Sequence, residues 1–217
     1  MRGVFVTGTG TEVGKTVVAA VIAQALARCG QRVGVFKPAL TGLDQPGEPD
    51  HALLRRAAGS GQDDDEIAPY RFGPPMSPHL AGRLGGRPID RDRLLEAARS
   101  AGRDRTLVAE GVGGLLVPLA GDYLARDLAR DLGLPIVVAA SPGLGTINHT
   151  LLTLEAARTA GLEVSAVVLT PWPAEPGEIE LDNRRTIAGI GQVDVVTLER
   201  IDLERPQTWP ELRVPGV

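Results

Sequence analysis

Near its start the chain reads Val4-Phe5-Val6-Thr7-Gly8-Thr9-Gly10-Thr11-Glu12-Val13-Gly14-Lys15-Thr16. The apolar run at the beginning is typical of a buried strand. The glycines that follow let the backbone turn tightly and direct successive N–H groups towards one anion. A helix predicted to begin at Lys15 adds the positive end of its dipole. The segment therefore predicts a phosphate-binding loop, in which Lys15 contacts phosphate oxygens and the Thr16 hydroxyl ligates Mg²⁺.

The spacing of this loop is unusual, because five residues separate Gly8 from Gly14 where the common pattern has four. A chance Gly-Lys-Thr turn is the alternative, but it would leave the preceding strand and the following helix unexplained. We therefore expect the bound group to be a nucleoside triphosphate. Its phosphates should be contacted by the consecutive residues Glu12, Val13, Gly14, Lys15, Thr16 and Val17.

Lysine is rare in this chain. Lys15 and Lys37 are the only lysines among 23 basic residues, and Lys37 directly follows a second apolar run, Val33–Phe36. Lysine carries a compact charge on a flexible stem, whereas arginine is a rigid planar fork. Arginine-rich codon usage with two leftover lysines is the alternative, but it would not place both at the ends of successive predicted strands. We predict that Lys15 and Lys37 converge on one triphosphate terminus and are both catalytic.

Short apolar runs alternate with longer amphipathic stretches along the chain. The runs predict strands at 4–6, 33–36, 107–109, 136–139, 164–169 and 193–198. The stretches predict helices at 15–28, 52–58, 91–101, 124–132 and 146–160. This alternation is typical of an α/β fold with a doubly wound, mostly parallel sheet and helices on both faces. We expect one domain over residues 1–217, with ligands bound at the carboxyl edge of the sheet.

Composition narrows the function classes. The net charge is −4 and the arginines are scattered among acids, which argues against a nucleic-acid surface. The longest apolar stretch, 17–27, is too short to span a bilayer, and no secretory signal is visible. We therefore expect a cytoplasmic protein with neither a nucleic-acid nor a membrane partner. The single cysteine, Cys29, excludes an intrachain disulfide, and we expect it to pack near the end of the first helix.

Two carboxylates are candidates to complete a Mg²⁺ site with Thr16. Glu110 follows the predicted strand at 107–109 and precedes a glycine-rich turn, so it should lie at the same sheet edge as the phosphate loop. A surface glutamate at a strand end is the less favoured alternative. Asp50 begins a predicted helix, where spacing alone favours an N-cap role and a metal role equally. The acidic segment 62–66 is expected to be a solvated turn.

Other classes of phosphate-loop protein fit less well. The Asn-Lys-x-Asp motif that GTPases need is absent. Partition ATPases carry an additional lysine early in the loop, where this chain has Thr9 and Gly10. A nucleotide-switched ATPase and an amide-forming synthetase of related fold remain the alternatives. Lys37 instead suggests an anionic substrate held beside the γ-phosphate.

Together these motifs resemble the dethiobiotin synthetases, the ATP-dependent enzymes that carboxylate and cyclise a diamine in biotin biosynthesis. The resemblance covers nearly the whole chain. It is carried by 6–16, Phe36-Lys37-Pro38, Thr41-Gly42, Glu110-Gly111-Val112-Gly113-Gly114, Leu144-Gly145-Thr146-Ile147-Asn148-His149, and more weakly by Met76-Ser77-Pro78-His79 and Gly86-Arg87-Pro88-Ile89.

The resemblance implies a ligase whose substrates are 7,8-diaminononanoate, CO₂ or bicarbonate, and ATP with Mg²⁺. One amine would take up CO₂ as a carbamate, which would attack the γ-phosphate to give a carbamic-phosphoric anhydride. The second amine would close the ring and release phosphate. Carried over by position, the metal ligands would be Thr16, Asp50 and Glu110, which resolves the choice at Asp50. Further nucleotide contacts would come from Gly111, Val112 and Gly113.

The family also implies a homodimer with its substrate site at the interface. The diamine or carbamate would contact Thr11, Lys37 and Thr41. The substrate's carboxylate tail would bind the helix start of the partner subunit, through Leu144, Gly145, Thr146 and Asn148. Free N–H groups and the helix dipole make this plausible, although residue pattern alone favours an ordinary helix start with Asn148 in its first turn.

The chain departs from the family pattern near the nucleotide base. Better-known members read adenine with an Asn-Asp pair after the strand at 164–169, where this chain has Thr170 and Pro171. Neither side chain can pair with both adenine N6 and N7, so we hypothesise relaxed base selectivity. Leu198 and Glu199 are expected to border the base or ribose. A family tyrosine that contacts the substrate tail is replaced, with Asn183 as the candidate, and His51 is expected at the surface.

Overall fold

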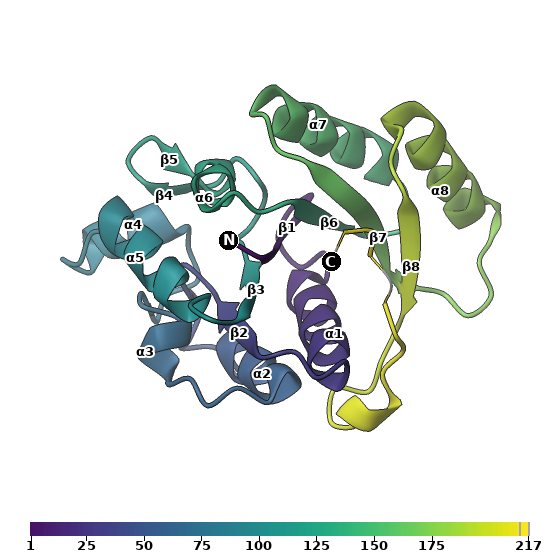
Figure 1. The fold of residues 1–217 in the computed structure, drawn as a ribbon. Coiled ribbons are helices and arrows are strands. Elements are labelled where there is room, and N and C mark those ends of the chain that lie inside the picture. Colours follow the sequence, from purple (N-terminus) through teal and green to yellow (C-terminus); the bar gives the residue numbers. More distant parts are fainter. Residues whose placement is uncertain (213, 217) are drawn as a thin grey trace.

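The computed structural model describes residues 1–212 and 214–216. Within this part of the chain the strands form a parallel six-stranded sheet of order β2-β3-β1-β6-β7-β8, and a separate two-stranded antiparallel ribbon, β4-β5 (Figure 1). The strands are β1 Gly3–Gly8, β2 Val33–Phe36, β3 Thr106–Glu110, β4 Pro118–Ala120, β5 Tyr123–Leu124, β6 Ile136–Ala140, β7 Val164–Trp172 and β8 Val195–Glu199. The predicted fold class, a doubly wound parallel α/β sheet, is confirmed.

Helices cover both faces of this sheet (Figure 1). They are α1 Lys15–Arg28, α2 Asp50–Ala58, α3 Asp64–Ile67, α4 Pro78–Leu84, α5 Arg91–Ala101, α6 Ala125–Leu132, α7 Thr146–Thr159 and α8 Glu178–Gly191, with a short 3-10 turn at Pro206–Thr208. No helix in the described part of the chain is both long enough and apolar enough to cross a membrane.

Alternation along the central strands divides the core in two. In β1, Val4 and Val6 face a layer built from α1 and α2, while Phe5 faces the layer of α5, α6, α7 and α8. All three side chains are fully buried. Both faces of the strand are apolar because a parallel sheet is covered on both sides. The two faces of the sheet form the core, and the loops at its carboxyl edge are where such a fold binds ligands.

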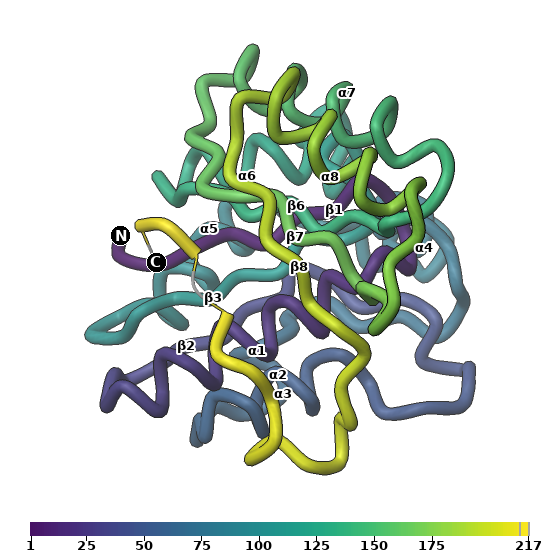
Figure 2. The backbone as a smooth tube through the Cα atoms, turned by 90° about the vertical axis from the view of Figure 1, so that its right-hand side faces the viewer, coloured from purple at the N-terminus to yellow at the C-terminus, as the bar shows by residue number. Residues whose placement is uncertain are grey.

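Residues 206–212 lie along α1 (Figure 2). Trp209 is buried in the α1 layer of the core. Gln24 and Arg28 on α1 both donate hydrogen bonds to the carbonyl oxygen of Pro206, at 2.6 and 3.0 Å. The segment therefore packs the side of α1 that neither the sheet nor α2 covers.

Several local expectations are wrong. The last strand begins at Val195 rather than residue 193, and α4, α8 and the β4-β5 ribbon have no counterpart among the predicted elements. His51 is buried rather than at the surface, and Cys29 is exposed rather than packed. The acidic segment 62–66 is not a simple solvated turn, because Gln62 is buried and Asp63 caps α3.

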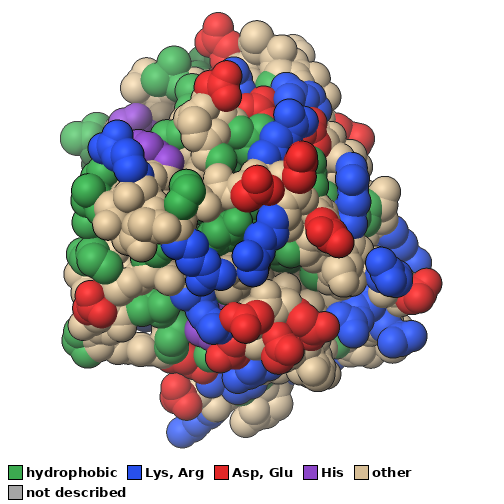
Figure 3. Space-filling model, turned by 90° about the vertical axis from the view of Figure 1, so that its left-hand side faces the viewer, with side chains coloured by type: hydrophobic (Ala, Val, Ile, Leu, Met, Phe, Trp, Pro, Cys, Tyr) green, Lys and Arg blue, Asp and Glu red, His purple; other side chains and the backbone are tan. Residues whose placement is uncertain are grey.

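Charged residues intermingle on the side of the molecule shown in Figure 3, where Lys and Arg side chains lie among Asp and Glu. One such group joins α2 to α3. The Asp64 carboxylate lies 2.6 Å from Arg55 Nη1, 3.4 Å from His51 Nε2 and 3.7 Å from Arg71 Nη1. Desolvation tends to raise the pKa of Asp64, but the charges of these neighbours outweigh it and hold that pKa below its ordinary value.

This charge group predicts a pH-dependent stability. A carboxyl with a lowered folded pKa stabilises the fold above its unfolded pKa, and the stabilisation is lost as pH falls through the folded pKa. Because Asp64 is partly exposed, we expect Asp64→Asn to lower the free energy of unfolding by only about 0.5–1 kcal/mol at pH 7. The difference from wild type should shrink below about pH 4.

Urea unfolding at a series of pH values measures this difference. Asp65→Asn is the matched control, because Asp65 is more exposed than Asp64 and its ion pair is with Arg71. A wild-type–Asp64→Asn difference that stays constant down to pH 3 would contradict the assignment.

Candidate active site

A cleft of about 770 Å³ opens at the carboxyl edge of the sheet. Its walls come from the loop after β1, the segments after β2 and the loop after β3, which neighbour one another because β1, β2 and β3 are adjacent. The lining residues are Thr11, Glu12, Gly14, Lys15, Thr16, Val17, Lys37, Ala39, Thr41, Gly42, Gln45, Asp50, Pro75, Met76, Ser77, Pro78, Glu110, Val112, Gly113 and Val117. Both lysines of the chain therefore face one cleft.

The loop between β1 and α1 has the geometry of an anion cradle. Gly14 has φ 85°, a left-handed conformation that favours glycine. A Cβ on Gly14 would lie 2.6 Å from Cγ2 of Thr170, so the residue is also required to be small. Lys15 Nζ donates a hydrogen bond to the carbonyl oxygen of Gly10 at 2.7 Å, which folds the side chain over its own loop. Burial lowers the pKa of Lys15 and the charge of Lys37 lowers it further, with partial opposition from Glu110.

Lys37 is enclosed by two carboxylates. Its Nζ lies 2.6 Å from Glu110 Oε1 and 2.8 Å from Asp50 Oδ2. The same Glu110 oxygen accepts a hydrogen bond from the Thr16 hydroxyl at 2.9 Å. Four side chains, from the first turn of α1, the residue after β2, the start of α2 and the end of β3, are thus joined in one network.

The charges of this network shift one another's ionisation. Burial disfavours the charged form of Lys37, but Glu110 and Asp50 outweigh it and raise its pKa. Burial likewise tends to raise the pKa of Asp50, and Lys37 reverses this and lowers it. Burial raises the pKa of Glu110, assisted by the nearby Asp50 charge. Lys15 interacts with the same two carboxylates, so two ammoniums and two carboxylates balance one another in this network.

The oxygen donors of this network fit a hard divalent cation. Thr16, Asp50 and Glu110 bring a hydroxyl and two carboxylates together, and Glu110 Oε2 is buried with no hydrogen-bond partner among the described residues. Mg²⁺ prefers oxygen ligands and usually keeps waters or phosphate oxygens in its shell, so two carboxylates and a hydroxyl suffice. These three residues could hold Mg²⁺.

The structure excludes one of the two sequence interpretations of Asp50. Pro49, not Asp50, occupies the N-cap position of α2, and the Asp50 carboxylate points to Lys37. The N-cap alternative is therefore wrong. Thr11, Thr41, Val112 and Gly113 also line the cleft, whereas Gly111 packs against the ring of Phe5.

The four residues predicted to lie near the nucleotide base fall into two groups in the structure. Thr170 is buried with its methyl group against Gly14, and Leu198 lies in the core beside α1. Pro171, which follows a cis peptide bond, and Glu199 instead line a second recess of about 390 Å³. The complete lining is Pro171, Trp172, Pro173, Ala174, Glu199 and Arg200.

The predicted tail-binding residues lie elsewhere. Leu144, Gly145, Thr146 and Asn148 form the start of α7 and are absent from the lining of this chain's own cleft. Leu144 is 97% exposed. Asn183 is buried on α8 and donates hydrogen bonds to backbone carbonyls in the loop before α7.

Sequence reasoning missed part of both linings. In the cleft these are Ala39, Gly42, Gln45, Pro75, Met76, Ser77, Pro78 and Val117; in the recess they are Trp172, Pro173, Ala174 and Arg200. Of these, only Gly42 and the Met76-Ser77-Pro78 segment carried a signal, as parts of the family resemblance. The others lie outside the phosphate motif and reach the ligand sites through tertiary structure.

Comparison with known proteins identifies relatives of the chain. Residues 2–203 match the family described as "AAA domain". ATP-dependent dethiobiotin synthetase BioD of Anaeromyxobacter dehalogenans strain 2CP-1 is 48% identical over 171 residues, covering 78% of this chain and 76% of the relative. The BioD proteins of Rhodococcus erythropolis strain PR4 and Bacillus subtilis strain 168 are 42% and 36% identical, covering 89% and 90% of this chain and 86% of each relative.

Solved structures share the fold at low sequence identity. A ParA family ATPase from Chlorobium tepidum superimposes with a TM-score of 0.56 at 11% identity, over 95% of this chain and 89% of that one. The cell division ATPase MinD of Pyrococcus furiosus gives 0.55 at 16% identity, over 92% and 84%. The fold is thus that of phosphate-loop ATPases, and the sequence relatives show that the chain belongs to the ATP-dependent dethiobiotin synthetase family.

Proposed function

We propose that this chain uses ATP to carboxylate and cyclise 7,8-diaminononanoate with CO₂, giving dethiobiotin, ADP and phosphate. The family assignment supports the reaction. The observation that carries it is the position of Lys37, buried beside the phosphate loop and held between Asp50 and Glu110. The Lys37 ammonium, held in this position, can contact both the terminal phosphate and the anion that attacks it.

The reaction requires charge stabilisation more than covalent help from the protein. A substrate amine adds to CO₂ and loses a proton, giving a carbamate. A carbamate oxygen then forms a bond to the γ-phosphorus while the bond to ADP breaks. The second amine attacks the carbamoyl carbon and expels phosphate, which closes the ureido ring. Lys15 and Lys37 would stabilise the charge on the transferring phosphoryl oxygens.

Mg²⁺ held by Thr16, Asp50 and Glu110 would neutralise part of the triphosphate charge. Two of these ligands, Asp50 and Glu110, also pair with Lys37, so its buried ammonium has charged partners. The lining of the cleft also includes the apolar side chains of Met76, Pro78 and Val117, which suit the alkyl chain of the substrate. Thr11 and Thr41 would contact its nitrogen or carbamate groups.

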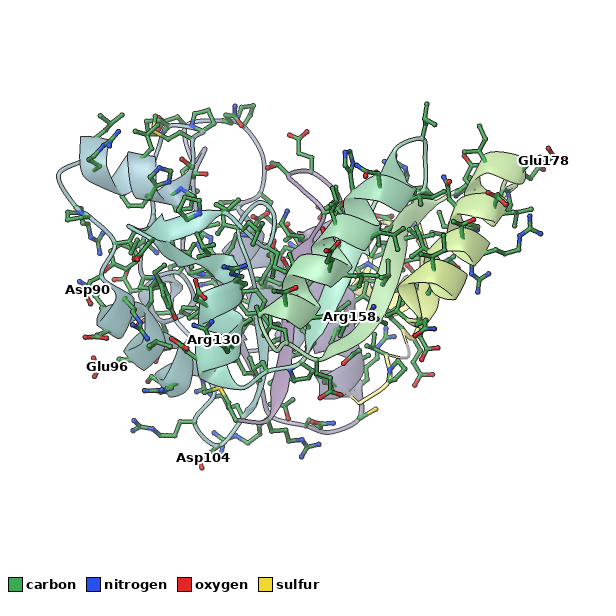
Figure 4. All side chains as sticks on the ribbon, turned by 90° about the horizontal axis from the view of Figure 1, so that it is seen from above. Asp90, Glu96, Asp104, Arg130, Arg158 and Glu178 are labelled. Atoms are coloured by element: carbon green, nitrogen blue, oxygen red, sulfur yellow. The ribbon has the colours of Figure 1, made fainter. Side chains whose placement is uncertain are left out.

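We propose a homodimer formed through α7 and α8, which lie side by side (Figure 4). Large apolar side chains are exposed there, with Leu144 97%, Ile190 66%, Leu152 57% and Ile179 56% accessible. Such an apolar surface is typical of an interface. A second copy would bring its α7 start, with Gly145, Thr146 and Asn148, to the cleft of the first.

Replacing Lys37 tests the proposed chemistry. We expect Lys37→Ala to lower turnover by ~100-fold or more, the scale for losing one transition-state charge donor. Nucleotide binding should be largely retained, because Lys15 and the loop N–H groups remain. Dethiobiotin formation measured by product mass, together with nucleotide titration, separates the two effects. Arg71→Ala, at the α2–α3 charge group, is the control, and wild-type turnover in Lys37→Ala would remove Lys37 from the mechanism.

The recess at Pro171 predicts relaxed base selectivity. Thr170 is buried against Gly14, and Pro171 has no N–H to donate to a base. We expect kcat/KM values for ATP, CTP and GTP to lie within about tenfold of one another, since no bidentate base contact of a few kcal/mol is available from this pair. Steady-state assays with the three nucleotides measure this, and a strong preference for ATP would count against it.

The dimer proposal is tested by charge placed in the apolar surface. Leu152→Glu should shift the protein towards monomers in sedimentation and lower turnover, because each cleft would lose the partner's α7 start. Leu84→Glu is the matched control, since Leu84 is 68% exposed on α4, away from α7 and α8. A Leu152→Glu protein that sediments as wild type and keeps its activity would exclude this surface as the interface.

A further inference from the structure

Asn183 connects helix α8 to the loop that precedes α7. It lies on α8 and is only 7% exposed. Its Nδ2 donates hydrogen bonds to the carbonyl oxygens of Pro142 and Gly143, at 2.8 and 3.2 Å. Both acceptors are carbonyls, so the amide orientation is fixed by chemistry: only the NH₂ group can donate to them. The side chain is thus engaged with the loop that leads from β6 into α7.

That loop sets the geometry at the start of α7. Gly145, the N-cap residue, has φ 90°, and Thr146 N donates to the carbonyl oxygen of Gly143 at 3.2 Å. Among the described residues no side chain caps this helix, and its first turn contains no acidic residue. Its leading N–H groups are therefore not compensated by the chain's own acids or cap side chains.

The two carbonyls bound by Asn183 carry partial negative charge close to this helix start. Without Asn183, the Pro142 carbonyl would lose this donor and the Gly143 carbonyl would keep the Thr146 N–H, so the turn before Gly145 would lose the contact that ties it to α8. The amide compensates both dipoles and ties the turn to α8. The positive end of the α7 dipole is then presented in one conformation, which lowers the ordering cost of binding an anion.

We propose that Asn183 is a positioning residue for carboxylate recognition: it holds the Pro142–Gly143 turn so that the start of α7 is preformed to receive the carboxylate tail of the substrate. The inference rests on the proposed function, in which α7 binds that tail. In this proposal Asn183 acts through the turn, in place of the direct tail contact that the sequence comparison suggested. Its effect should appear in discrimination between carboxylate and neutral substrates.

The test compares 7,8-diaminononanoate with its primary amide, which has the same length and no charge. Asn183→Asp keeps the shape but loses both donors, and Asn183→Leu loses the donors without adding charge. We expect each variant to raise KM for the carboxylate substrate about tenfold, the scale of a helix-terminus charge interaction in a partly buried site. KM for ATP and kcat should change little. The ratio of kcat/KM for acid to that for amide should fall about tenfold.

Asp182→Asn, at the neighbouring exposed position of α8, is the matched control and should keep the wild-type ratio. If the Asn183 variants lower kcat/KM equally for both substrates, or retain the wild-type ratio, the positioning role is overturned. If the wild-type enzyme itself does not distinguish acid from amide, the tail-binding role of α7 fails instead. Thermal unfolding of each variant identifies a general loss of structure. The inference stands only if Asn183→Asp and Asn183→Leu both lower the acid-to-amide ratio of kcat/KM.

Discussion

A buried contact between Lys37 and Glu110 is the interaction on which the site depends. The parallel register pairs Phe36 of β2 with Ala109 of β3, so the next residue on each strand is Lys37 and Glu110. Glu110 is in turn aligned with Val6 of β1, two residues before the phosphate loop begins. Burying either charge alone would be unfavourable, and removing one partner of a buried pair costs ~3–5 kcal/mol. The sheet register therefore brings the two charges together, and the cost of leaving either one unpaired favours that register.

Contacts around the Lys37–Glu110 pair also hold β2 and Lys37 in position. Gln62 fixes the free edge of β2, since its side-chain amide accepts from Val35 N at 2.8 Å and donates to Val35 O at 3.1 Å. The Lys37 amide donates to the carbonyl of Ile67 at 2.8 Å. An edge strand of four residues is thus paired on both sides, and the lysine that follows it is held in position by backbone contacts as well as by charge.

The part of the site predicted from sequence follows from sheet topology. Lys15, Lys37 and Glu110 each follow an apolar run, and parallel strands bring such positions to one edge. The contacts of His51 and Asn183 could not be predicted, because their partners lie on other elements and leave no local pattern. Helix α8 was missed for a related reason. Ile179 and Ile190 are exposed, so its apolar residues do not mark a single buried face.

The shared fold does not by itself specify the chemistry. The ParA and MinD structures resemble this chain at 11% and 16% sequence identity, and this similarity supports only a shared architecture. What distinguishes this chain is where its second lysine stands. Thr9 and Gly10 leave the early part of the phosphate loop uncharged, whereas Lys37 follows β2, two strands away from β1 in the sheet, and reaches the site beside Glu110. In the proposed function, a lysine at this position contacts both the transferring phosphate and a second reactant beside it, as a ligase requires and simple hydrolysis does not.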